Sequence, residues 1–181
     1  MSQTNRHSRE ARLDTMTPEM KEIVAENMKE RVYSTITLIA VLTVMWQNAN
    51  HHSTIGVITI IFGSVVALWM ATLISIRMSY RAIHGRPINM ANYRKALFSA
   101  SGLLAPAITP FIIIAVSGAT HWYDLKSALM ASMVVSLLSL FALSFNASRR
   151  IYDSIWRQLL VSLLEMSVGV GVILLKLAVG E

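Results

Sequence analysis

The sequence predicts an all-α polytopic membrane protein with five transmembrane helices, preceded by an amphipathic N-terminal helix. Hydrophobic residues make up 54% of the 181-residue chain and charged residues only 14%, whereas a soluble domain carries about 25% charged residues. The apolar residues gather in five long runs, and crossing a hydrocarbon core takes about 20 residues. A chain of this length suffices for one helical bundle and leaves no room for a second domain.

The N-terminal part is predicted to be a polar tail followed by a helix at the membrane surface. Residues 1–16 are polar and mixed in charge, which is typical of a disordered tail. An amphipathic interfacial helix is expected over residues 17–31, because Thr17 is a good N-cap and Pro18 suits the first helical position. The apolar side chains that follow fall on one face of this helix: Met20, Ile23, Val24 and Met28.

The other face of this predicted helix carries acidic residues at four-residue spacing, Glu22, Glu26 and Glu30. Like charges at this spacing repel one another. One hypothesis is a carboxylate stripe that attracts cations and holds a metal ion. The alternative is a solvated face whose charge is relieved by the neighbouring basic residues, which are Lys21, Lys29 and Arg31.

The first two spans are predicted over residues 32–48 and 54–76. The first is short and rich in hydroxyl groups, and Trp46 marks its far interface. The second carries small residues four apart, a spacing that favours close packing against another helix. Met70 lies on that face, and two interpretations of it stay open: a soft metal ligand, or a side chain that fills a packing gap.

The third span, residues 95–119, is predicted to be kinked or broken near its middle. Pro106 and Pro110 lie there, and proline removes a backbone donor and clashes with the preceding turn. In lipid, irregular backbone persists only where neighbouring helices or a cavity cover it. We therefore expect this span to be the interior helix of the bundle.

The fourth and fifth spans are predicted over residues 127–146 and 155–179. Polar and small side chains of the fifth span lie within about 40° of one direction at 100° per residue. Such a stripe is unfavourable against lipid, so we expect it to face the interior. Its members are Gln158, Ser162, Glu165, Gly169 and Lys176.

Glu165 is the residue of the fifth span that bears most directly on function. It lies about nine residues inside the interface, roughly 13 Å along a helix. A carboxylate at that depth is costly unless it is protonated, paired or hydrated. We interpret it as a proton or cation site, with Met70, Ser162 and Gln158 as further candidates along an ion path. The alternative is a protonated glutamate that only holds helices together through serines of the fourth span.

The basic residues predict the orientation of the chain. Of the 16 Lys and Arg residues, 14 fall on one side of a five-span arrangement, and only Lys126 and Lys176 fall on the other. The positive-inside rule then places the N-terminus in the cytoplasm and the C-terminus outside. We expect a multi-pass protein of the cell inner (plasma) membrane. Although the pI is about 10.0, we do not expect nucleic acid binding, because the charges flank apolar runs.

The back half of the chain, residues 92–180, resembles the vacuolar iron transporter family, a group of five-span proteins. The similar segments are 102–106, which read Gly-Leu-Leu-Ala-Pro, together with 146–150 and 156–160. Residues 67–71 of the second span are also similar. The chain departs from the family at 33–35 and 73–75, where the family has acidic residues and this chain has uncharged ones.

This resemblance implies a homodimer of five-helix subunits that exchanges a divalent metal such as iron or manganese for protons. The family's path lies between the first and second spans, where only Met70 of this chain matches. The function expected is therefore divalent cation or proton transport. The alternative is a non-transporting relative that acts as a membrane scaffold or binds a protein partner.

The sequence does not favour an enzyme or a resident cofactor. No Ser-His-Asp, metal-ligand or phosphate-loop spacing occurs in it. Cysteine is absent, which excludes disulfides and thiolate metal sites. The partners expected are the lipid bilayer, a second copy of the chain and the transported ion.

Overall fold

The computed structural model describes residues 17–120, 123–149 and 151–179, so the predicted disordered tail at 1–16 lies outside the described residues. Within these ranges all regular structure is helical, which confirms the all-α fold class. The elements are α2 (Pro18–Gln47), η1 (Ala49–His51), α3 (Thr54–His84), α4 (Met90–Ala100), η2 (Ser101–Leu103), η3 (Ala105–Ala107), α5 (Ile108–Thr120), α6 (Leu125–Ser148) and α7 (Ile155–Val179).

Four stretches of the described chain are long and apolar enough to cross a membrane, judged by length and composition. They are α3, the segment Met90–Thr120, α6 and α7. Helix α2 is not among them, since its N-terminal half carries many charges and only its C-terminal half is apolar. A fifth span within α2 therefore stays a prediction.

The predicted surface helix and the predicted first span form one continuous helix, α2. The Thr17 side chain accepts a hydrogen bond from the backbone N–H of Met20 at 3.4 Å, and Pro18 occupies the first turn as expected. The boundary between the predicted surface helix and the predicted span falls at residues 31 and 32. Neither glycine nor proline occurs near this boundary, so the helix continues through it. The composition of α2 changes from polar to apolar along its length, but the helix is continuous.

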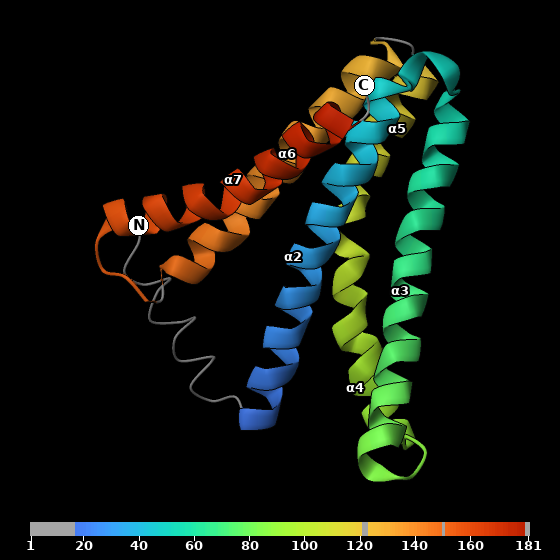
Figure 1. The fold of residues 1–181 in the computed structure, drawn as a ribbon. Helices are drawn as coiled ribbons and strands as arrows, with labels where there is room; N and C mark the ends of the chain where they lie inside the picture. The colour runs from blue at the N-terminus through green and yellow to red at the C-terminus, as the bar shows by residue number, and fades with distance from the viewer. Residues whose placement is uncertain (1–16, 121–122, 150, 180–181) are drawn as a thin grey trace.

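Helix α2 lies in the middle of the bundle, with α6 and α7 on one side and the broken third span and α3 on the other (Figure 1). It packs against α3, α4, α6, α7 and the 3-10 turns η2 and η3. Its residues Leu38, Ile39 and Leu42 are almost completely buried. The prediction that residues 95–119 form an interior helix stays a prediction, and α2 covers the broken side of that span.

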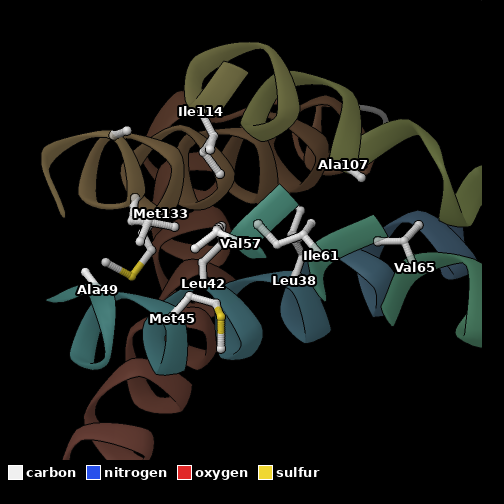
Figure 2. Packing of buried hydrophobic residues seen from close by; sticks show 12 residues of the cluster. Leu38, Leu42, Met45, Ala49, Val57, Ile61, Val65, Ala107, Ile114 and Met133 are labelled. Atoms are coloured by element: carbon white, nitrogen blue, oxygen red, sulfur yellow. The ribbon is translucent and has the colours of Figure 1, made fainter. Parts of the chain in front are cut away.

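The hydrophobic core lies where α2 meets α3, α5 and α6 (Figure 2). Leu38 and Leu42 of α2 belong to the same buried cluster as Val57 and Ile61 of α3. Ile114 of α5 and residues of α6 close the other side of this cluster. Apolar side chains of α2, α3, α5 and α6 thus pack together, and this contact involves the upper half of α2 in Figure 1.

The third span is broken, as its prolines predict. Helix α4 ends at Ala100, two 3-10 turns follow, and α5 resumes at Ile108. Pro106 lies in the second of these turns. The interruption exposes backbone carbonyl groups that an unbroken helix would satisfy internally.

Polar side chains of α2 donate hydrogen bonds to these carbonyl groups. The Asn27 Nδ2 atom donates to the oxygens of Phe98 and Ser99, at 3.0 and 3.1 Å. The buried Ser34 hydroxyl donates to the oxygen of Leu103 at 2.6 Å. The break is therefore stabilised by two residues that lie seven positions apart, on one side of α2.

Helices α3 and α4 extend beyond the predicted spans at 54–76 and 95–119. Helix α3 continues to His84, where Gly85 adopts φ 62° and its N–H donates to the oxygen of Arg81. A left-handed residue of this kind ends many helices, and glycine adopts it without strain. Helix α4 begins at Met90, because the Asn89 side chain accepts from the N–H of Asn92 at 2.8 Å. These two caps leave a short connector.

Candidate functional site

The polar stripe predicted on the fifth span divides into a buried part and an exposed part. Gln158, Ser162 and Gly169 of α7 are buried, but Glu165 and Lys176 are exposed. On a helix, Glu165 lies at the edge of the surface formed by the three buried residues. Helix α7 therefore packs its small and amide side chains inward and presents Glu165 beside that contact.

The two buried polar side chains of this stripe form local hydrogen bonds. The Gln158 Nε2 atom donates to the oxygen of Tyr152 at 2.6 Å, which ties α7 to the connector before it. The Ser162 hydroxyl donates to the oxygen of Gln158 at 2.7 Å. These bonds satisfy both groups within α7 and its N-terminal connector, and neither residue lines the groove that contains Glu165.

Glu165 lines an open groove between α2, α6 and α7, with a volume of about 510 Å³. In Figure 1, α6 and α7 lean away from the lower half of α2, and the groove lies where these helices diverge. Helix α2 contributes one face, with residues at positions i, i+3, i+4 and i+7. The lining residues are Lys29, Val32, Tyr33, Ile36, Leu140, Glu165 and Val168.

The two charged residues of the groove have different surroundings. The Lys29 ammonium lies 2.8 Å from an oxygen of Glu26, one turn earlier on α2. This hydrogen bond and the negative charge of Glu26 raise the pKa of Lys29 above its ordinary value. Within the described residues the ion pairs are Lys29–Glu26 and Lys95–Glu19, and neither includes Glu165. Glu165 is the one acidic residue among those that line the groove, and its carboxylate takes part in neither ion pair.

The serines of the fourth span do not hold Glu165 in this structure. Ser132 and Ser136 are buried, and each hydroxyl donates to the carbonyl group four residues earlier in α6, at 2.8 Å. Leu140 is the residue through which α6 reaches the groove. The interpretation of Glu165 as a group that joins helices through these serines thus has no hydrogen bond to support it in the described part of the chain.

Met70 is not brought together with Glu165. It is 53% exposed on α3 and does not line the groove. In Figure 1, α3 and α7 lie on opposite sides of α2. Of the four residues proposed for an ion path, Glu165 alone opens onto the groove, whereas Gln158 and Ser162 are packed inside and Met70 faces outward.

The acidic stripe of α2 is partly neutralised and partly buried. Glu26 pairs with Lys29, and burial raises the pKa of Glu30, with a further contribution from the charge of Glu26. No group of three or more His, Asp or Glu side chains is close enough to hold a metal ion in ranges 17–120, 123–149 and 151–179. A metal site at Glu22, Glu26 and Glu30 stays a prediction.

We expect Glu30→Gln to stabilise the protein at pH 7 and to have no effect near pH 3. A raised pKa in the folded state means that Glu30 favours folding below the ordinary pKa of glutamate, about 4.3. That contribution is lost as the pH rises through the folded-state value. Solvent screening limits the gain at pH 7 to about 0.5 kcal/mol.

Thermal unfolding in detergent between pH 3 and pH 8 measures this effect. Glu22→Gln removes an exposed carboxylate from the same helix and controls for net charge. A melting temperature that falls at pH 7 on replacing Glu30 would contradict the assignment.

The sequence predictions missed the α2 and α6 side of the groove. Lys29 was noted only as a counter-charge, and Tyr33 lay within a span described only as rich in hydroxyl groups. A signal was present, because residues 29, 33 and 36 share one face once 18–47 is treated as a single helix. Leu140 carried no such signal, since its role depends on where α6 crosses α2.

Comparisons with known proteins do not assign the chain to a family. No family model matches it, and neither a curated protein nor a solved structure matches it. The resemblance to vacuolar iron transporters, with the homodimer and divalent metal that it implies, therefore stays a prediction.

Proposed function

We propose that the protein is a five-span membrane carrier in which Glu165 holds one proton or one cation in the groove between α2 and α7. The observation that supports this is the placement of one carboxylate, Glu165, among apolar groove walls on a helix apolar enough to cross a membrane. Ionisable residues within such helices commonly mark ion pathways or proton relays. One carboxylate suits a proton or a singly charged cation.

The depth of Glu165 fits this role. It is the eleventh residue of α7, which places it about 15 Å along the helix axis from Ile155. The helix has 25 residues, so Glu165 would lie well inside a hydrocarbon core about 30 Å thick. A charge there is costly without a counter-ion or water, and binding a proton or cation removes that cost.

In this proposal the apolar half of α2, residues 32–47, is the fifth span. The chain reverses direction at the α2–α3, α3–α4, α5–α6 and α6–α7 connections, whereas α4 and α5 run in the same direction (Figure 1). Basic residues concentrate at the start of α2 and in the α3–α4 and α6–α7 connections. The positive-inside rule then favours a cytoplasmic N-terminus and an external C-terminus in a plasma membrane.

We expect Glu165→Gln to reduce proton flux about tenfold or more in proteoliposomes. A pH-sensitive dye inside the vesicles would report dissipation of an imposed proton gradient, with potassium and valinomycin clamping the voltage. Asp153→Asn removes an exposed carboxylate outside α7 and should retain the wild-type rate. The same vesicles test uptake of Mn²⁺ and Fe²⁺. Equal rates for wild type and Glu165→Gln with every ion would rule out this role.

A second candidate is a scaffold or partner-binding protein that transports nothing. It is favoured by the separation of Met70 from the groove and by the local hydrogen bonds that engage Gln158 and Ser162. It predicts that vesicles containing the wild-type protein leak protons, Mn²⁺ and Fe²⁺ no faster than empty vesicles. Flux above that background that depends on Glu165 would exclude it.

A further inference from the structure

We propose that the Glu165 groove binds an amphipathic organic cation, which is a singly charged cation with a bulky apolar body. This inference rests on the proposed function, because it names the substrate class of the same carboxylate. The groove combines one acidic group, one aromatic ring and several aliphatic side chains on three helices. Each of these corresponds to one part of such a molecule.

The size and walls of the groove suit an organic molecule better than a bare metal ion. Its volume of about 510 Å³ falls within the roughly 300–1,000 Å³ of small-molecule sites. Val32, Ile36, Leu140 and Val168 form aliphatic walls. Metal ions such as Ca²⁺ and Mg²⁺ require about six or more oxygen ligands, which these side chains do not offer. An apolar body would bury the accessible surface of Val32, Ile36 and Val168, whereas Leu140 is already buried.

The polar groups of the groove complement a positive charge. Glu165 is exposed to the groove and supplies a carboxylate. Tyr33 is 55% exposed on the facing helix, and its ring can contact a cation through its π face. An ammonium or phosphonium group placed between α2 and α7 would therefore meet a negative charge on one side and an aromatic ring on the other.

Lys29 helps to distinguish a cation from an anionic lipid as the occupant. Its ammonium is paired with Glu26 and its side chain is 70% exposed, so it lies at the polar rim of the groove. An organic cation at Glu165 would be repelled weakly by Lys29, whereas a lipid phosphate would be attracted to it. The Glu165 carboxylate opposes an anionic ligand, which is why we favour the cation.

The test measures binding of radiolabelled tetraphenylphosphonium to the full-length protein in nanodiscs by equilibrium dialysis. We expect Glu165→Gln to weaken binding about tenfold, and Tyr33→Leu to weaken it about threefold to fivefold. Tyr33→Phe keeps the aromatic face and should bind as the wild type does. Lys29→Met should bind as tightly as the wild type or severalfold more tightly.

A bulky substitution tests the apolar walls. Val168 is 52% exposed, so Val168→Trp fills the groove without disturbing the core, and we expect it to weaken binding about tenfold. Leu160→Trp adds the same bulk at a 64% exposed position of α7 that does not line the groove. It should bind normally. Gel filtration of each variant establishes that the fold is retained.

Three outcomes would overturn this inference. One is binding that Glu165→Gln leaves unchanged. Another is equal binding of neutral triphenylphosphine oxide, which would indicate simple partition into an apolar surface. The third is weaker binding by Lys29→Met together with displacement of tetraphenylphosphonium by phosphatidylglycerol, which would indicate a lipid site.

If proton flux depends on Glu165 but tetraphenylphosphonium does not bind, this inference fails and the proposed function stands. If proton flux is also independent of Glu165, both fail.

Discussion

Replacing Gly102 with alanine is expected to lower the free energy of unfolding by about 3 kcal/mol, the upper end of overpacking costs. Gly102 lies in the first 3-10 turn of the broken span, directly against α2. A Cβ atom there would lie 2.5 Å from the backbone oxygen of Asn27 and 3.0 Å from its Nδ2 atom. A backbone oxygen cannot rotate away, so the added methyl group must displace α2 or the turn.

Two other glycines provide matched controls for Gly102→Ala. At Gly169 a Cβ would meet Leu137 Cδ2 at 2.8 Å, the end of a side chain that can move, so the cost should be smaller. At Gly63 nothing lies within 4 Å, and alanine should stabilise the helix by about 0.5–1 kcal/mol. Unfolding in mixed detergent and dodecyl sulfate micelles measures all three. Equal stability of the three variants would show that the contact at Gly102 is not close.

The proline-broken span shows both what the sequence could predict and what it could not. Pro106 and Pro110 predict a break because each lacks a backbone donor. The α-helix is indeed interrupted by two 3-10 turns at residues 101–107. The identity of the covering residues was not predictable from local pattern. Asn27 and Ser34 are 71 and 69 residues away from the carbonyl groups of Phe98 and Leu103 that they bind, and this pairing depends on tertiary packing.

Helix ends were predictable where their capping residues were considered. Thr17 and Pro18 predicted the start of α2, and the start of α7 at Ile155 agrees with the predicted span. Helix α3 continues eight residues beyond the predicted second span, from 76 to His84. That prediction used hydrophobicity, which reports where a membrane ends, whereas Gly85 determines where the helix ends.

The sequence identified the candidate residue, Glu165, but not its position in the fold. Composition identifies Glu165, because an acidic side chain inside an apolar helix is rare at any position. Helical periodicity predicts that it faces the interior with Gln158 and Ser162, but the two are buried and Glu165 is exposed. The difference arises because α6 and α7 diverge from the lower half of α2 (Figure 1). The angle at which two helices cross depends on the packing surfaces of both, so the periodicity of α7 alone could not predict this divergence.

Replacing Asn27 with aspartate is expected to lower the free energy of unfolding by about 2–3 kcal/mol, and with alanine by about 1 kcal/mol. The Asn27 amide donates to the oxygens of both Phe98 and Ser99 beside the break. Alanine removes the donor, and the Phe98 oxygen keeps its bond from the Ser101 hydroxyl at 2.6 Å. Aspartate has the same shape as asparagine but directs a negative charge at two carbonyl oxygens, so it should cost more.

The pH dependence separates the charge effect from the lost hydrogen bonds. A protonated aspartic acid can donate one hydrogen bond, so the difference between the Asp and Ala variants of Asn27 should shrink below about pH 4. Asn146→Asp is the matched control, since the Asn146 amide is exposed and donates to Ala142 within its own helix. We expect it to change stability by less than about 0.5 kcal/mol. If Asn27→Asp were no more harmful than Asn146→Asp, the Asn27 amide could not be a group that stabilises the broken span.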